Sequence, residues 1–303
     1  MRGLSLVYIF GSFLFFAFLS LGGATDPISA THELKTSPLI VAIFDSGIDL
    51  THPELKPYLW ANTNEIANNH LDDDGNGLID DIHGVNWFSN NGDVQDDHPK
   101  GHGTHVAGLI AGIAQKDEIS NLKLMIFKAD LSNPGRSLNE SLRYAHQHQV
   151  KLFQLAYVQP PLPSFDQLIS SRALDIPKWL RWICAFYQGD PQVWSENFET
   201  LYKRYVFDFN KSWNQAMEKI RSIGNEVQVV ASAGFSNQQG SQKLLEPAGI
   251  HSQNMIVVLN GTSIESTLPL ILEPSGRGKL SGSSQASALV THQMAKQMII
   301  QGP

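Results

Sequence analysis

The chain has 303 residues, of which 42% are hydrophobic, and this is enough apolar material for the core of one large domain. Its 22 basic and 29 acidic residues give a formal charge of −7, and the basic residues are not clustered in the sequence. Both observations argue against a nucleic-acid partner. The single cysteine, Cys184, excludes a disulfide within the chain.

The first 24 residues have the pattern of a secretory signal peptide. A basic head at Met1-Arg2 precedes an apolar run from Leu4 to Leu21, and small residues follow at 22–24. We therefore expect cleavage near Ala24 and a secreted or periplasmic protein. An uncleaved membrane anchor is the alternative, because about 18 apolar residues approach the length that spans a bilayer. Residues 25–37 leave no room for a folding propeptide before the first predicted strand.

Strands and helices are predicted to alternate along most of the remaining chain. Residues 38–45 form an apolar run that ends in Asp45, as expected of a buried parallel strand with chemistry at its carboxyl end. A helical period follows in 137–149. Further strands are predicted at 122–127, 150–158, 227–231 and 255–259. This alternation predicts an α/β fold in which a mainly parallel sheet lies between helices.

Residues 159–222 break this alternation. They begin with a proline-rich stretch and contain four of the six tryptophans, Trp179, Trp182, Trp194 and Trp213. Two helices, at about 166–187 and 192–222, account for the spacing of the apolar residues. We interpret the segment as a helical insertion. Its aromatic residues either bury themselves against the main domain, or form a lid or partner-binding surface beside a cleft.

Three short motifs carry the chemistry, in the chain order Asp, His, Ser. Asp45 is followed by Ser-Gly, His102 opens the run His-Gly-Thr-His-Val-Ala-Gly at 102–108, and Ser284 lies in a Gly-x-Ser-x-Ala core. A serine hydroxyl becomes a strong nucleophile when an imidazole accepts its proton and a carboxylate fixes that imidazole's tautomer. Asp45, His102 and Ser284 fit these three roles.

The motifs and their order resemble those of the subtilisin-like serine peptidases, the subtilases, strongly over residues 38–130 and weakly over 225–296. The resemblance implies a subtilisin-like three-layer fold over 25–303. It also implies a serine endopeptidase that hydrolyses protein or peptide substrates through an acyl-enzyme. By resemblance, Asp45 ends the first core strand, whereas His102 and Ser284 each begin a helix. His105 is then the second histidine of the motif and not the base.

Other positions depart from the subtilase pattern. Phe235 occupies the place of the asparagine that donates to the oxyanion in subtilases, and Asn237 is the candidate replacement. In the segment expected to bind the substrate backbone, Ala156 and Val158 stand where subtilases carry Ser-x-Gly. These departures favour an alternative, a weak or inactive pseudo-peptidase that binds a protein partner through 159–222. A third possibility is an esterase, which needs less oxyanion stabilisation.

Residues 72–81 resemble the beginning of an EF-hand-like calcium loop, as found in many subtilases shortly before the His motif. The predicted ligands are the side chains of Asp72, Asp74, Asn76 and Asp80 and the carbonyl of Leu78. His83 stands at position twelve, where an EF-hand has glutamate, so the full pattern fails. The alternatives are a structural calcium ion and a solvated acidic turn.

Overall fold

The structure is a computed structural model, and it describes residues 37–113, 115–157, 162–170, 176–187, 197–233, 252–258 and 282–302. The predicted signal peptide at 1–24 lies outside these residues. So do three of the predicted substrate-binding positions, Val158, Phe235 and Asn237.

Six strands and six α-helices make up the described residues, with two short 3-10 helices. The strands are β1 (Leu39–Asp45), β2 (Gly84–Asn86), β3 (Leu122–Lys128), β4 (Leu152–Leu155), β5 (Gln228–Ser232) and β6 (Met255–Val258). The helices are α1 (His102–Ala111), α2 (Pro134–Gln147), α3 (Phe165–Ser170), α4 (Ile176–Phe186), α5 (Phe198–Ile223) and α6 (Ser283–Gln301), and the 3-10 helices are η1 (Lys56–Tyr58) and η3 (Gly224–Glu226).

All six strands belong to one parallel sheet in the order β2-β3-β1-β4-β5-β6. The predicted α/β class with a mainly parallel sheet is therefore confirmed. Strand β2 was not predicted, because its three residues are too short to show a period. Strand β4 is shorter at both ends than the predicted run at 150–158.

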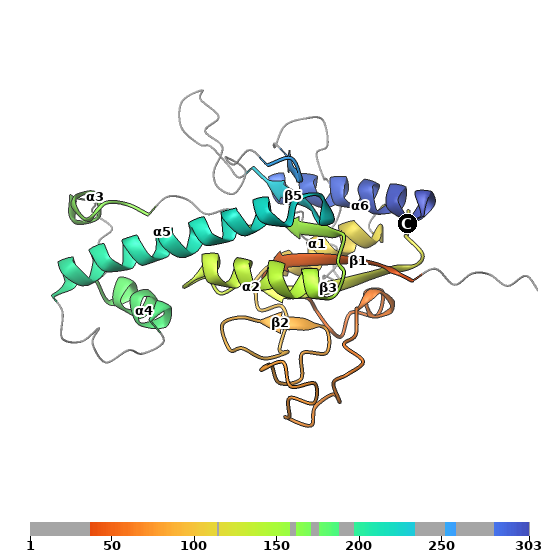
Figure 1. The fold of residues 1–303 in the computed structure, drawn as a ribbon, viewed down its shortest axis with the longest axis horizontal. Helices are drawn as coiled ribbons and strands as arrows, with labels where there is room; N and C mark the ends of the chain where they lie inside the picture. The colour runs from red at the N-terminus through yellow and green to blue at the C-terminus, as the bar shows by residue number, and fades with distance from the viewer. Residues whose placement is uncertain are drawn as a thin grey trace, which may run out of the picture. The chain divides into compact units, whose positions relative to one another are not determined.

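Helices cover both faces of the sheet (Figure 1). Alternate residues of β1 point to opposite faces, as in any strand. Ala42 and Phe44 pack in the core that includes residues of α2 and α5, whereas Val41 and Ile43 pack in the core that includes residues of α1 and α6. The sheet is therefore the middle of three layers, as the resemblance implied.

Helices α1 and α6 lie against each other on one face of the sheet. An ionic cluster joins the region after the carboxyl end of α1 to the later turns of α6. Asp117, beyond the end of α1, accepts two 2.7 Å contacts from Lys296 Nζ and one 3.2 Å contact from His292 Nε2. His292 Nδ1 also contacts the carbonyl of Ile110 at 3.0 Å. The cluster joins the helix that begins with His102 to the helix that begins beside Ser284.

Helix α5 has two differently packed halves. Its later residues, including Trp213 and Ile220, belong to the core beneath the sheet. Its earlier residues pack with α3 and α4 in a separate cluster formed by Leu168, Ile183, Leu201, Tyr202, Tyr205 and Phe209. The predicted insertion at 159–222 therefore includes a part of the main core, and only its first part forms a helical cluster of its own.

Within the predicted helix 166–187, the described residues form α3 and α4, and residues 171–175 lie outside the described part of the chain. Among the described residues, no helix combines the length and the apolar composition needed to cross a bilayer.

Candidate active site

Asp45 and His102 form a hydrogen-bonded pair at the carboxyl end of the sheet. Asp45 is the last residue of β1, and His102 is the first residue of α1. The Nδ1 atom of His102 lies 2.7 Å from Asp45 Oδ1, and the two side chains are 24% and 4% exposed. The imidazole therefore has one nitrogen on the carboxylate, which leaves Nε2 for the reacting group.

Close packing of glycine backbones brings these two elements together. A Cβ atom on Gly103 would lie 2.1 Å from the carbonyl oxygen of Gly47. Only glycine fits at such an approach, so Gly103 of the motif allows the start of α1 to pack against the residues that follow β1.

Asp96 connects the residue that follows Asp45 with the helix that begins at His102. Its Oδ1 accepts hydrogen bonds from Ser46 Oγ at 2.9 Å and from the amide of His98 at 3.0 Å. Its Oδ2 accepts from the amide of Thr104 at 2.9 Å and from Thr104 Oγ1 at 2.6 Å. Ser46 Oγ in turn accepts from the amide of Gly103 at 3.0 Å. One carboxylate thus ties the residue after Asp45 to the first turn of α1.

The charges around His102 set its protonation. Burial lowers the pKa of the imidazole, but the charge and hydrogen bond of Asp45, with a smaller contribution from Asp96, raise it above its ordinary value of 6.5. His105, by contrast, is fully buried, and burial and the neighbouring His102 lower its pKa to about 4. Between the two histidines of the motif, only His102 therefore has an imidazole that its carboxylate neighbours stabilise in the protonated form.

Ser284 lies in the first turn of α6, beside the end of β4. Its Oγ donates a hydrogen bond to the carbonyl of Ala156 at 3.3 Å. Among the described residues no hydrogen bond joins Ser284 to His102, and such contacts are often long before a substrate binds. The start of a helix also directs backbone N–H groups toward developing negative charge.

Buried polar side chains fix α6 to β4 one turn after Ser284. Gln154 Nε2 donates to Ser287 Oγ at 2.7 Å, and Thr291 Oγ1 donates to Gln154 Oε1. Ser287 Oγ donates to the carbonyl of Ser284 at 2.9 Å. Gln154, Ser287 and Thr291 are all fully buried, so these bonds are shielded from water.

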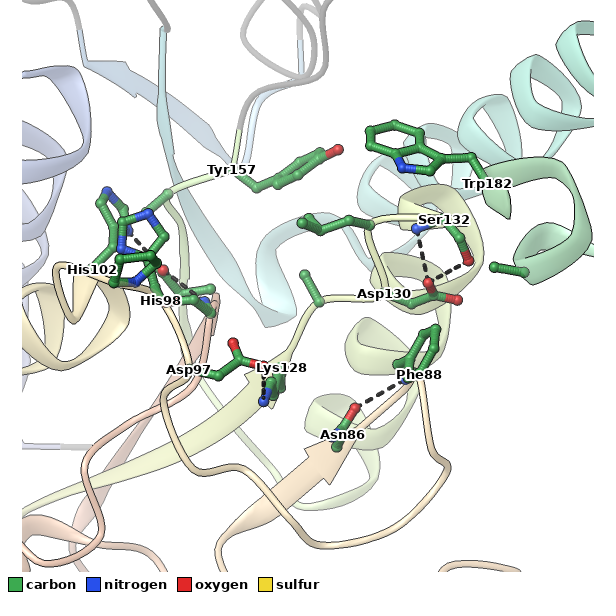
Figure 2. Close-up of a pocket in the computed structure, with 17 residues that line it drawn as sticks. Asn86, Phe88, Asp97, His98, His102, Lys128, Asp130, Ser132, Tyr157 and Trp182 are labelled. Carbon is green, nitrogen blue, oxygen red and sulfur yellow. Dashed lines mark hydrogen bonds and ion pairs between the residues drawn. The ribbon is translucent and has the colours of Figure 1, made fainter. Parts of the chain in front are cut away.

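A cavity of about 810 Å³ opens beside the Asp45–His102 pair. Its lining comes from the segments before α1, after β3 and after β4, and from α4 of the helical cluster (Figure 2). Ala156, one of the predicted substrate-binding residues, lines it. Trp182 and Ala185 also line it, so the helical segment takes part in this site.

The predicted calcium loop is folded around its own carboxylates. Asp72 accepts hydrogen bonds from the amides of Asn76 and Gly77, and Asp80 accepts from the amides of Asn69 and His70. The side chain of Asn76 and the backbone of Leu78 lie in the same turn, where the amide of Leu78 donates to Asn76 Oδ1.

A group of three carboxylates lies within this region. Oxygen atoms of Glu65, Asp74 and Asp81 all lie within 4.8 Å of one another. Of the predicted ligands, this group includes Asp74. Glu65 and Asp81 were not identified from the sequence, because Glu65 precedes the loop and Asp81 falls outside the alternating positions.

Asp96 and the place of Trp182 in the cavity lining are two further features that were not predicted from the sequence. The only signal for Asp96 was a carboxylate shortly before the His motif, in an acidic stretch where others compete. The sequence shows that tryptophans are frequent in the helical segment around Trp182. Their frequency does not indicate which of them face a cavity.

Comparison with known proteins identifies the family of the chain. The model of the subtilase family matches residues 36–268. Over 84 residues the chain is 50% identical to Subtilisin-like protease 1 of Plasmodium berghei, an alignment that covers 27% of this chain and 13% of that protein. Over 271 residues it is 26% identical to the Major intracellular serine protease of Bacillus subtilis, covering 86% and 69%.

Among solved structures, a cold adapted subtilisin-like serine proteinase aligns with a TM-score of 0.47 and 14% identity, over 88% of this chain and 78% of that one. In the sequence alignments, the chain spans only a small part of the Plasmodium relative but most of the bacterial one. From the family model, the chain belongs to the subtilase family of serine peptidases.

Proposed function

We propose that the chain is an exported serine endopeptidase that hydrolyses peptide bonds of protein or peptide substrates. Ser284 is the nucleophile, His102 the general base and then the general acid, and Asp45 the residue that orients His102. The observation that carries the proposal is the 2.7 Å contact between Asp45 Oδ1 and His102 Nδ1 beside an open cavity.

The reaction begins when Ser284 Oγ attacks the carbonyl carbon of the scissile bond. Its proton passes to Nε2 of His102, whose raised pKa reflects the stabilisation of the resulting imidazolium by Asp45. His102 then gives this proton to the leaving amine as the C–N bond breaks and the acyl-enzyme forms. Water, deprotonated by His102, hydrolyses the ester and restores Ser284.

A fluorophosphonate probe tests this assignment, because it reacts rapidly only with an activated serine. The full chain should be labelled, Ser284→Ala should not be, and the adjacent control Ser283→Ala should keep its labelling. Labelling that persists in Ser284→Ala would refute the nucleophile. A folded but unlabelled wild-type protein would instead favour the non-catalytic alternative, in which the helical segment binds a protein partner.

The oxyanion hole is the weakest point of the sequence match. Phe235 at the asparagine position removes a side-chain donor, and loss of one such donor lowers turnover by about 10²–10³. We propose that Asn237, two residues later in the chain, supplies the replacement amide. Phe235→Asn should then raise peptide turnover if the missing donor limits the rate, and Asn237→Ala should lower turnover in the wild type if Asn237 supplies it.

A calcium ion is the proposed structural cofactor of the region before α1. Calcium prefers carboxylate and carbonyl oxygens, and the neighbouring oxygens of Glu65, Asp74 and Asp81 fit that preference. Bound there, the ion would supply positive charge against the mutual repulsion of these carboxylates. The sequence-based ligands Asp72, Asn76, Leu78 and Asp80 stay predictions. Asp72 and Asp80 accept backbone hydrogen bonds, as Glu65 does.

Export is proposed from residues 1–24 alone, which carry the basic, apolar and small-residue pattern of a signal peptide. N-terminal sequencing of the mature protein tests this. A first residue just after Ala24 supports cleavage, whereas an intact N-terminus in the membrane fraction supports the anchor.

A further inference from the structure

The cavity beside His102 gathers exposed apolar side chains from distant parts of the chain. Phe88, Leu131 and Trp182 are 67%, 58% and 39% exposed, and all three line the cavity. Tyr157 adds a fourth large ring to the lining. Large apolar side chains that gather at a concave surface indicate a ligand-binding site rather than a chance exposure.

Helix α4 is anchored on one side and faces the cavity on another. Ile183 is fully buried in the cluster that α4 shares with α3 and α5. Trp182 and Ala185, three residues apart and therefore on one side of the helix, line the cavity. In Figure 2 the indole of Trp182 projects from α4 toward the cavity on the side of Tyr157.

The charged groups of the lining are already paired with one another or with their neighbours. Lys128 Nζ lies 2.8 Å from Asp97, and Asp45 holds His102. The third carboxylate, Asp130, accepts two hydrogen bonds from Ser132 and lies 3.4 Å from Arg136. These pairings leave little charge to attract a charged ligand, so the lining favours an apolar one.

We infer that Trp182 on α4, with Tyr157, Phe88 and Leu131, forms a subsite for a bulky apolar side chain of the peptide substrate. The inference rests on the proposed peptidase function, because the subsite shares its cavity with His102. A peptide whose scissile bond lies at Ser284 and His102 passes beside this lining, and burial of one large apolar side chain there strengthens binding. The helical segment then selects substrates.

Paired peptide substrates test the subsite. Internally quenched peptides of one sequence would carry Phe or Ala, in turn, at each position on either side of the scissile bond. At one position the wild-type kcat/KM should favour Phe over Ala by about tenfold or more. Trp182→Ala should reduce the ratio of kcat/KM for the Phe peptide to that for the Ala peptide to about one. The control Phe207→Ala removes an aromatic ring of α5 that is 69% exposed and outside the cavity lining, so it should keep the preference.

A filling variant tests the same point without removing a side chain. Ala185→Phe should fill the cavity beside Trp182, and it should lower kcat/KM for the Phe peptide more than for the Ala peptide. Equal thermal unfolding of all variants would show that they fold.

Binding measurements separate failure of the subsite from failure of the peptidase function. If no peptide is cleaved, the proposed enzymatic function fails, and fluorescence anisotropy with labelled Phe and Ala peptides decides the subsite alone. Tighter binding of the Phe peptide, lost in Trp182→Ala, supports it. A wild type that does not discriminate in either assay, or a preference that survives Trp182→Ala, overturns it.

Discussion

The hydroxyl of Ser284 donates a hydrogen bond to the carbonyl of Ala156 at 3.3 Å, although 128 residues separate the two in the chain. Ala156 directly follows β4, which is the neighbour of β1 in the sheet. Asp45 ends β1, so the predicted nucleophile and the residue that orients the base lie at the carboxyl ends of adjacent strands. Parallel sheets commonly assemble their active sites at this edge.

Removing either member of the Asp45–His102 pair should abolish most of the activity. Asp45→Asn keeps the side chain's shape but removes its charge and replaces one oxygen with an N–H donor, which favours the wrong tautomer of His102, so kcat should fall by about 10⁴. His102→Ala should lower it at least as far. The double variant should be no worse than His102→Ala, because the residues act as a unit. Independent, multiplying losses in peptide-hydrolysis kinetics would contradict a shared mechanism.

Asp96 should act as a positioning residue that is visible in the pH profile. The raised pKa of His102 predicts that kcat/KM rises with pH through a value above 6.5, because only the neutral imidazole accepts the proton of Ser284. Asp96→Asn removes a negative charge that raises this pKa, so the acidic limb should shift to lower pH. The exposed Asp93→Asn is the control. A limb that stays in place in Asp96→Asn would show that Asp96 acts on stability alone.

Gly103→Ala should damage both folding and activity. The added Cβ would lie 2.1 Å from the carbonyl oxygen of Gly47, so the start of α1 must move away from β1. Overpacking of this kind costs about 1–3 kcal/mol of unfolding free energy. Urea denaturation would measure the loss, and the rate of fluorophosphonate labelling would report the displaced His102. An unchanged midpoint with full labelling would mean that the two elements are less tightly joined than the structure shows.

Gln154→Ala should weaken the packing of α6 against β4 and lower the free energy of unfolding. It removes the acceptor of the buried Thr291 hydroxyl and the donor to Ser287 Oγ, and loss of a buried partner costs about 1–3 kcal/mol. Because Ser287 also bonds to the carbonyl of Ser284, the labelling rate should fall as well. Gln147→Ala, at the exposed end of α2, is the matched control. Equal stability of the two variants would disprove the structural role of Gln154.

Calcium should raise the thermal unfolding temperature of the wild type, and a chelator should reverse the rise. Asp74→Asn should weaken this response under either ligand set, because Asp74 belongs to both. Glu65→Gln should also weaken it if the ion binds the three carboxylates that the structure brings together. If Asp72→Asn removes the response and Glu65→Gln leaves it, the sequence-based loop is the site. An absent response in the wild type would indicate a solvated acidic turn.

Much of the fold was predictable because the information was local. The apolar run before Asp45 predicts a strand, and the small residues after His102 predict the start of a helix. The structure has β1 and α1 at those places. The sequence also identified Ser284 as the start of a helix, which α6 confirms. The boundaries of the helical segment were less predictable, since α5 exchanges one set of packing partners for another along its length.

By itself, the sequence therefore determined the order of the Asp, His and Ser motifs, the alternation of strands and helices, and the acidic character of the loop before α1. Only the tertiary structure decided that Asp96 bridges Ser46 and Thr104, that Glu65 and Asp81 approach Asp74, and that Trp182 faces the cavity. These relationships depend on how loops turn back and on how helices pack against the sheet. A local pattern records which side chains are present but not which of them meet in the folded chain.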